Sequence, residues 1–160
     1  MRIKNNFLPS KSFNRIKEVV INKHFPWFFK HELNENQKKE DLNSYFTHTF
    51  YFNNNINSRE FEILDSFLKA IEAKALIRVV ANFYFKTDKI VQHAKHVDYE
   101  FPHKGALLSL NTCDGGTILE NGTKVNSVEN TVLFFDPSKP HASTSTTNAK
   151  GRINIQVNYF

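Results

Sequence analysis

The chain from residue 76 onward is divided into short runs of β-branched and aromatic residues separated by Gly, Asn, Asp and Pro. The runs are LIRVVANFYF, GALLSLNT, GTILE, TVLFFD, HASTSTT and RINIQVNYF. Their lengths are typical of strands, and Asn121-Gly122 predicts a hairpin between two of them. Many short strands with regular turns favour a β-sandwich or a jelly-roll barrel. We therefore expect a jelly-roll core over residues 76–160.

Before this core, the segment from Leu8 to Phe25 has apolar residues at helical spacing. These apolar residues are Phe13, Ile16, Val19 and Val20. Ser10 or Ser12 is placed to cap the start of a helix, and Pro26 is placed to end it. The segment therefore predicts an amphipathic helix.

A second helix is predicted within residues 57–73, with Asn57 or Ser58 as its cap. One face of it carries Phe61, Leu64, Phe67, Leu68 and Ile71. WFFKHEL and YFTHTFYF, residues 45–52, predict two strands, and we expect the polar stretch Asn34–Asn43 to be a loop over the barrel mouth. The predicted fold is α+β and mainly β, a double-stranded β-helix with two N-terminal helices packed on its outer face.

The composition is that of a globular protein of one domain, residues 1–160, with residues 1–75 supporting the jelly-roll core. Cys113 is the single cysteine, which excludes an internal disulfide and a cysteine-based zinc site. No apolar run is long enough to span a membrane, and we expect a soluble, cytosolic protein. The net charge of +5 comes from Lys and Arg spread along the chain. Nucleic-acid binding is therefore not favoured.

The stretch HAKHVDYEFPH, residues 93–103, allows three interpretations: a His93/His96 metal pair, a His96/Asp98 metal pair, or no metal. Strand alternation places residues i and i+2 on one face, which favours His96 with Asp98. His93 does not share that face. His93 and His103 are predicted to be surface or rim residues, and whether either of them, or Tyr99, contacts substrate is left open.

Two later residues complete a candidate site. His141 is the one histidine after residue 103, and Arg152 is the one arginine of the last 70 residues. Two imidazoles and one carboxylate form the facial triad of non-haem iron(II) enzymes. Arginine matches a carboxylate with two parallel hydrogen bonds and stays charged when buried. On a strand paired with that of His141, Arg152 could hold the far end of a dicarboxylic cosubstrate.

These elements resemble, in order from about residue 76 to the end, those of the 2-oxoglutarate- and iron(II)-dependent dioxygenases. HVD, LLSLNTCDGGTIL, NTVLFFDPSKPH and KGRINIQVNYF are similar to the H-x-D, Y-L-N-x-x-x-G-G-x-T, distal histidine and G-x-R elements. The likeness is nearest to the prolyl-4-hydroxylase-like branch, although that branch usually has Lys where Arg152 stands. The first 75 residues resemble small members encoded by marine phages and bacteria.

The resemblance implies that His96, Asp98 and His141 are iron ligands and that Arg152 binds the C5 carboxylate of 2-oxoglutarate. It also places Asn82 and Tyr84 where relatives contact 2-oxoglutarate. The implied reaction consumes O2 and 2-oxoglutarate, releases succinate and CO2, and hydroxylates a peptide, an amino acid or a small molecule. Ascorbate is left open as a reductant. The alternatives are a cupin-like metal-binding jelly roll and a non-catalytic ligand-binding module.

Overall fold

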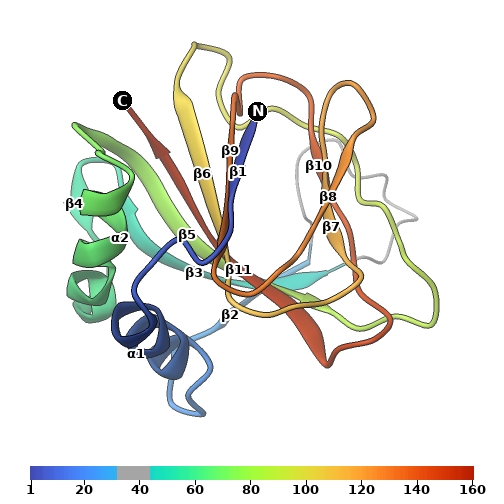
Figure 1. Ribbon diagram of the computed structural model, residues 1–160, viewed down its shortest axis with the longest axis horizontal. Helices are drawn as coiled ribbons and strands as arrows, with labels where there is room; N and C mark the ends of the chain where they lie inside the picture. The colour runs from blue at the N-terminus through green and yellow to red at the C-terminus, as the bar shows by residue number, and fades with distance from the viewer. Residues whose placement is uncertain (32–43) are drawn as a thin grey trace.

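The computed structural model describes residues 1–31 and 44–160, so the loop predicted over Asn34–Asn43 lies outside the described residues. A large antiparallel sheet dominates the molecule, in the strand order β1-β9-β6-β11-β5-β3-β2. Its strands are β1 (Arg2–Lys4), β2 (Phe28–Lys30), β3 (Tyr45–Phe52), β5 (Leu76–Phe85), β6 (Lys104–Ser109), β9 (Thr131–Phe135) and β11 (Gly151–Tyr159). The short β4 (Asn55–Ile56) pairs with β3. Strands from before residue 76 thus extend the sheet on both sides (Figure 1).

A second sheet of three strands, in the order β10-β7-β8, lies to one side of the large one (Figure 1). Its strands are β7 (Gly116–Ile118), β8 (Lys124–Asn126) and β10 (Ala142–Ser143). The predicted Asn121-Gly122 hairpin joins β7 to β8, and Gly122 has a φ of +82°. A side chain there would strain the turn. The two sheets form the jelly roll that the sequence predicts.

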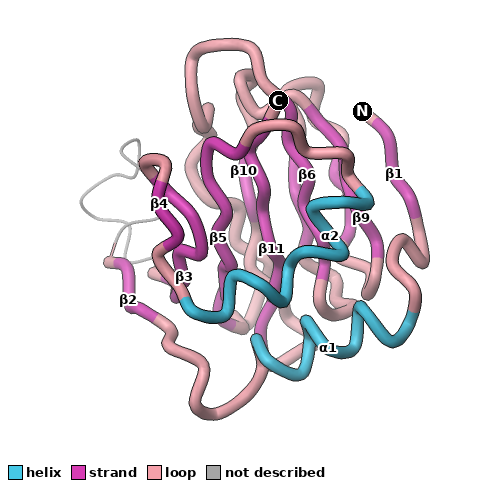
Figure 2. The backbone as a smooth tube through the Cα atoms, turned by 90° about the vertical axis from the view of Figure 1, so that its left-hand side faces the viewer, coloured by secondary structure: helices cyan, strands magenta, loops and turns pink. Residues whose placement is uncertain are grey.

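The helices lie across the outer face of the large sheet (Figure 2). They are α1 (Ser10–Val20), the 3₁₀-helix η1 (Arg59–Leu64) and α2 (Asp65–Ala70). Their apolar faces and the outward-facing side chains of β3, β5, β6, β9 and β11 form the main core. Its fully buried members include Ile16, Phe50, Leu64, Phe67, Val79, Leu108, Val132, Ile155 and Val157. Burial of each such side chain stabilises the fold by roughly 1.5–3 kcal/mol, and this core holds β5 and β11 in place.

The ends of both helical segments differ from the predictions. The N-cap of α1 is Pro9, with no side-chain hydrogen bond, so neither predicted serine caps it. The helix ends at Val20 rather than at Pro26, because the backbone N–H of Asn22 turns to the carbonyl of Val19 and closes a tighter final turn. The second segment begins as a 3₁₀-helix, with Ser58 accepting from the backbone N–H of Glu60 as its cap.

The chain from 86 to 103 contains no regular strand, so the strand alternation used to pair His96 with Asp98 is not what places them together. It makes three isolated bridges, of Lys86 with Thr146, Gln92 with Thr144, and His96 with His141. None of the helices in the described parts of the chain has the length and apolar character needed to cross a membrane.

Candidate metal centre and anion site

The inner face of the large sheet is polar. Every second residue of β11 points inward, and the four are Arg152, Asn154, Gln156 and Asn158, each at most 8% exposed. Across the ladder on β5, Tyr84 is opposite Arg152, Asn82 is opposite Asn154, and Arg78 is opposite Asn158. Burying polar groups costs free energy unless they find partners. An interior lined in this way is therefore suited to a polar ligand rather than to a sealed core.

Three side chains converge at the end of this face where β9 stops and β6 begins. The Nε2 atom of His96 is 3.7 Å from Oδ1 of Asp98, and that of His141 is 4.0 Å from the same oxygen. The candidate ligand atoms of the three residues all lie within 4.8 Å of one another. Among the described residues, no other group of three histidine, cysteine or acidic side chains is arranged to hold a metal.

Both imidazoles are held with Nε2 toward the centre. Nδ1 of His141 is 2.9 Å from the carbonyl of Lys139, and Nδ1 of His96 is 3.4 Å from the carbonyl of Ala94. A carbonyl only accepts, so each Nδ1 carries the hydrogen and each Nε2 presents a lone pair. Burial, and next the neighbouring His141, lowers the pKa of His96, which favours the neutral ring that a metal requires.

The two histidines are also joined through their backbones. The N–H of each donates to the carbonyl of the other at 2.9 Å, which is the isolated bridge between residues 96 and 141. The N–H of Asp98 donates to the carbonyl of Pro137, also at 2.9 Å. These bonds bring the H-x-D segment and the β9–β10 turn together without a regular strand.

Asp98 is held by two further side chains that the sequence analysis does not identify. Its carboxylate is only 3% exposed. Arg78 Nη2 donates to Oδ1 at 2.9 Å, and Gln156 Nε2 donates to Oδ2. The inward alternation of R-x-N-x-Q-x-N along RINIQVNYF is the sequence signal that could have found Gln156.

The donor set fits a hard divalent cation. Two neutral imidazoles and one carboxylate, with positions left open, are the ligands of non-haem iron(II). Neighbouring ligands of an octahedral ion with bonds of about 2.1 Å lie about 3 Å apart. The three side chains would therefore draw together by roughly 1 to 2 Å on binding.

Arg152 lies deeper in the same interior and has an unusual environment for a cation. It is 1% exposed, and no acidic group in the described parts of the chain lies within ion-pair distance. Its Nη2 donates to Thr117 Oγ1 at 2.8 Å, whereas its Nε is buried with no hydrogen-bond partner. Burial lowers the pKa of the guanidinium. A buried charge with a spare donor is a site for an anion.

Arg152 does not reach this place by the predicted strand pairing. The strand after His141, β10, pairs with β7, whereas β11 is hydrogen-bonded to β5 and β6 along its two edges. Arg152 instead approaches the small sheet across the barrel, with Nη1 at 3.5 Å from the carbonyl of Thr144. The prediction of paired strands is therefore wrong, because both edges of β11 are already occupied.

Asn82 and Tyr84 both lie on the inner face next to this site. The guanidinium carbon of Arg152 is 5.4 Å from the centre of the Tyr84 ring. Tyr45 stacks on Tyr84 with 5.6 Å between the ring centres. Burial raises the pKa of Tyr45 to about 12, so its phenol stays neutral. Asn82 donates to Asn154 Oδ1 at 3.3 Å. The wall of the interior beside Arg152 is therefore made of neutral polar side chains.

His93 and His103 are buried, at 5% and 8% exposure, which corrects the prediction that they are surface or rim residues. His93 packs against Tyr84 at 5.3 Å between ring centres and is hydrogen-bonded to Ser143 Oγ at 2.7 Å. His93 and His103 are the buried residues of a segment, 86–103, that is otherwise exposed or half-buried, and the Tyr84 ring that His93 contacts also lies 5.4 Å from the guanidinium carbon of Arg152. His93 therefore lies on the side of Arg152 rather than outside the site.

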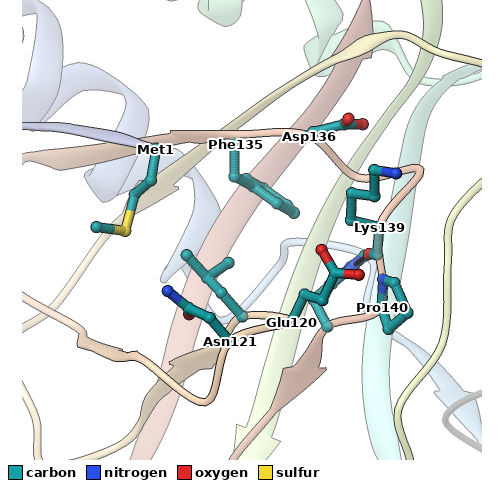
Figure 3. Close-up of a pocket in the computed structure, with 9 residues that line it drawn as sticks. Met1, Glu120, Asn121, Phe135, Asp136, Lys139 and Pro140 are labelled. Carbon is teal, nitrogen blue, oxygen red and sulfur yellow. Dashed lines mark hydrogen bonds between the residues drawn. The ribbon is translucent and has the colours of Figure 1, made fainter.

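A cavity of about 220 Å³ opens beside His141, between the β7–β8 hairpin and the β9–β10 turn. Figure 3 shows Phe135 and Glu120 pointing into it, with Lys139 at its rim. Its wall combines apolar side chains with two acids and one lysine. Of the three candidate ligands, His141 is the one that lines this cavity.

Solved structures show the same arrangement of elements. A prolyl hydroxylase from Trichoplax adhaerens, in complex with a hypoxia inducible factor peptide, has a TM-score of 0.72 at 16% identity, over 99% of this chain and 82% of that one. An oxidoreductase of the 2OG-Fe(II) oxygenase family from Burkholderia pseudomallei also has a TM-score of 0.72, at 14% identity, over 97% and 81% of the two chains. A Pseudomonas putida prolyl-4-hydroxylase has a TM-score of 0.63 at 13% identity, over 99% and 90%.

The chain has the jelly-roll fold of these oxygenases. The match extends over nearly all of it, including the helices and strands before residue 76. No protein-family model matches the sequence, and no curated protein is similar to it. The solved structures therefore show the fold, and the function has to be argued from the site.

Proposed function

We propose that the protein is an iron(II)- and 2-oxoglutarate-dependent dioxygenase of the prolyl-4-hydroxylase-like branch. One observation carries the proposal: a two-histidine, one-carboxylate cluster shares its barrel interior with a buried arginine that has no ion pair within the described chain. A set of metal-binding side chains alone would suit many functions. The second site, where the cationic Arg152 can bind an anion at the far end of the same interior, favours a cosubstrate that is both a metal chelator and a carboxylate.

In this proposal His96, Asp98 and His141 bind iron(II) through Nε2, one carboxylate oxygen and Nε2. Both imidazoles are set in the tautomer that a metal needs by backbone carbonyls. Three ligands leave three positions of an octahedron for other molecules. Bound iron(II) and 2-oxoglutarate would together supply the chemistry, in which O2 oxidises the cosubstrate to succinate and CO2 and hydroxylates the substrate.

Arg152 would bind the C5 carboxylate of 2-oxoglutarate, with its unpartnered Nε as one of the donors. Arg152 and the Asp98 partner Gln156 lie on the same face of β11, four residues and therefore about 13 Å apart along the strand. Tyr84 and Asn82 are proposed as the neutral walls that position the cosubstrate between them. Low exposure on this side excludes water, which strengthens the ion pair.

The substrate class is proposed as a peptide, an amino acid or a small molecule that reaches the centre by the cavity beside His141. The peptide bound by the Trichoplax adhaerens prolyl hydroxylase supports the first of these. A reducing, cytosolic location is also proposed, since Cys113 is free and buried.

Succinate formation tests the proposal. Wild-type protein incubated with Fe(II), 2-oxoglutarate, ascorbate and O2 is expected to form succinate, slowly without substrate and faster with a suitable one. His141→Ala is expected to abolish the signal. Lys17→Met, which removes a partly exposed ion pair between α1 and Glu129, is the matched control. Succinate formation by His141→Ala equal to that of wild type would reject the proposed centre.

A further inference from the structure

The two oxygens of the Asp98 carboxylate have different partners. Oδ1 accepts from Arg78 Nη2 at 2.9 Å, and Oδ2 accepts from Gln156 Nε2. The donor on Gln156 is unambiguous, because an ionised carboxylate can only accept. Both oxygens of the Asp98 carboxylate are thus hydrogen-bonded to protein side chains in the metal-free structure.

Both partners stand on rigid elements. Gln156 lies on β11, in the middle of the large sheet, and its Nε2 also lies 3.5 Å from Oδ1 of Asn158, which is fully buried. Arg78 lies on the neighbouring β5, and its guanidinium carbon is 5.7 Å from the centre of the Tyr99 ring. Side chains whose own positions are fixed by packing can hold a ligand within the tolerance that a site requires.

The oxygen that faces the metal centre is Oδ1. It is the atom that lies 3.7 Å from Nε2 of His96 and 4.0 Å from Nε2 of His141. A carboxylate oxygen has two lone pairs, so the bond from Arg78 leaves one of them for a cation. Oδ2 is engaged by Gln156 on the side of the β11 ladder.

We propose that Gln156 and Arg78 are positioning residues that present Asp98 to the metal through Oδ1 alone. This inference rests on the proposed function and deepens it. If Oδ2 could also turn to the metal, Asp98 would occupy two positions, and one fewer would remain for the cosubstrate and O2. By holding Oδ2 away from the metal, Gln156 keeps three coordination positions of the metal open. Arg78 neutralises the charge of the buried Asp98 carboxylate.

A different result is expected if the contacts of Arg78 and Gln156 with Asp98 serve only the stability of the fold. Loss of Arg78 or Gln156 would then lower the stability of the fold but would leave the coordination of a bound metal unchanged. The two roles are separated by the metal's own spectrum, because the visible absorption of Co(II) reports the number and geometry of its ligands.

The experiment is an anaerobic titration of the full chain with Co(II), followed by 2-oxoglutarate, for wild type, Gln156→Met, Arg78→Met and Arg78→Lys. The two Met variants are expected to bind Co(II) about 10- to 100-fold more weakly, and to give a Co(II) spectrum different from that of wild type. Arg78→Lys keeps a cationic donor and is expected to recover most of the affinity. Lys17→Met removes the surface ion pair with Glu129 and is expected to match wild type.

Wild-type affinity and an unchanged spectrum in both Gln156→Met and Arg78→Met would overturn the inference while the proposed function stood. No Co(II) binding by folded wild type would overturn both. Thermal unfolding of each metal-free variant separates misfolding from loss of ligation. If Gln156→Met does not fold, Gln156→Asn retains the amide but is one methylene shorter, and it carries the same expectation.

Discussion

Replacing Arg152 by methionine should separate function from stability. The arginine is a fully buried cation without an ion pair among the described residues, so in the ligand-free protein it costs free energy. The interactions that offset this cost are one hydrogen bond to Thr117, a weak contact with the carbonyl of Thr144, and a cation–π contact with Tyr84.

The magnitudes can be compared. A hydrogen bond from a charged donor contributes about 1.5–3 kcal/mol, and a desolvated cation–π contact contributes about 2 kcal/mol. The desolvation of an unpaired charge costs several kcal/mol. We therefore expect Arg152→Met to leave the unfolding free energy of the ligand-free protein unchanged, or to raise it by about 1–3 kcal/mol. Loss of two charge-assisted bonds to a carboxylate should weaken 2-oxoglutarate binding at least about 100-fold.

Urea unfolding with and without Mn(II) and 2-oxoglutarate measures both quantities. Wild type is expected to gain stability with 2-oxoglutarate by mass action, and Arg152→Met is expected to gain none in the same range. Arg152→Lys keeps the charge and loses the planar fork, so it should fall between the two. If Arg152→Met is several kcal/mol less stable without ligand, the arginine is a structural residue and the reasoning fails.

Three further changes test the packing and the electrostatics. Phe67→Ala removes a fully buried ring between α2 and the sheet and should lower the unfolding free energy by about 3–5 kcal/mol, measured in urea; a loss below about 1 kcal/mol would contradict the described core. Gly115→Ala places a methyl group 2.3 Å from the Ser145 carbonyl and 3.1 Å from the Arg152 side chain, so calorimetry should show weaker 2-oxoglutarate binding, and unaltered binding would count against this packing. Burial lowers the pKa of His48 and of His96. At low pH these two histidines then bind protons more readily in the unfolded chain than in the metal-free folded protein. The free energy of unfolding should therefore fall as the pH drops from 7 to 5.5, by up to about 1.4 kcal/mol per pH unit for each histidine. A free energy of unfolding that rises over this range would refute the prediction.

The sequence predicts the architecture because periodicity and turn chemistry are local signals. The hairpin at Asn121-Gly122 and the strand at residues 45–52 form as predicted, since a turn dipeptide and side-chain alternation need no information from distant residues. Helix ends are less local. The early stop of α1 at Val20 accompanies the tighter final turn from Asn22 to Val19, which the spacing of apolar residues does not encode.

The sequence indicates which residues form the candidate site but not which backbone contacts bring them together. His96, Asp98 and His141 come together as predicted, yet through isolated bridges rather than regular strands. The burial of His93 and the partners of Asp98 depend on which residues face each other across the ladder from β5 to β11. That register is a tertiary property, and a single sequence leaves it open.

The central claim is that one interior binds a metal at His96, Asp98 and His141 and a dicarboxylate at Arg152. Its most direct test is an anaerobic titration of the metal-free protein with Fe(II) and 2-oxoglutarate, monitored in the visible range. The account predicts a metal-to-ligand charge-transfer band that is absent in His141→Ala and that needs at least about 100-fold more 2-oxoglutarate in Arg152→Met. A folded wild-type protein that gives no band at saturating Fe(II) and 2-oxoglutarate would contradict it.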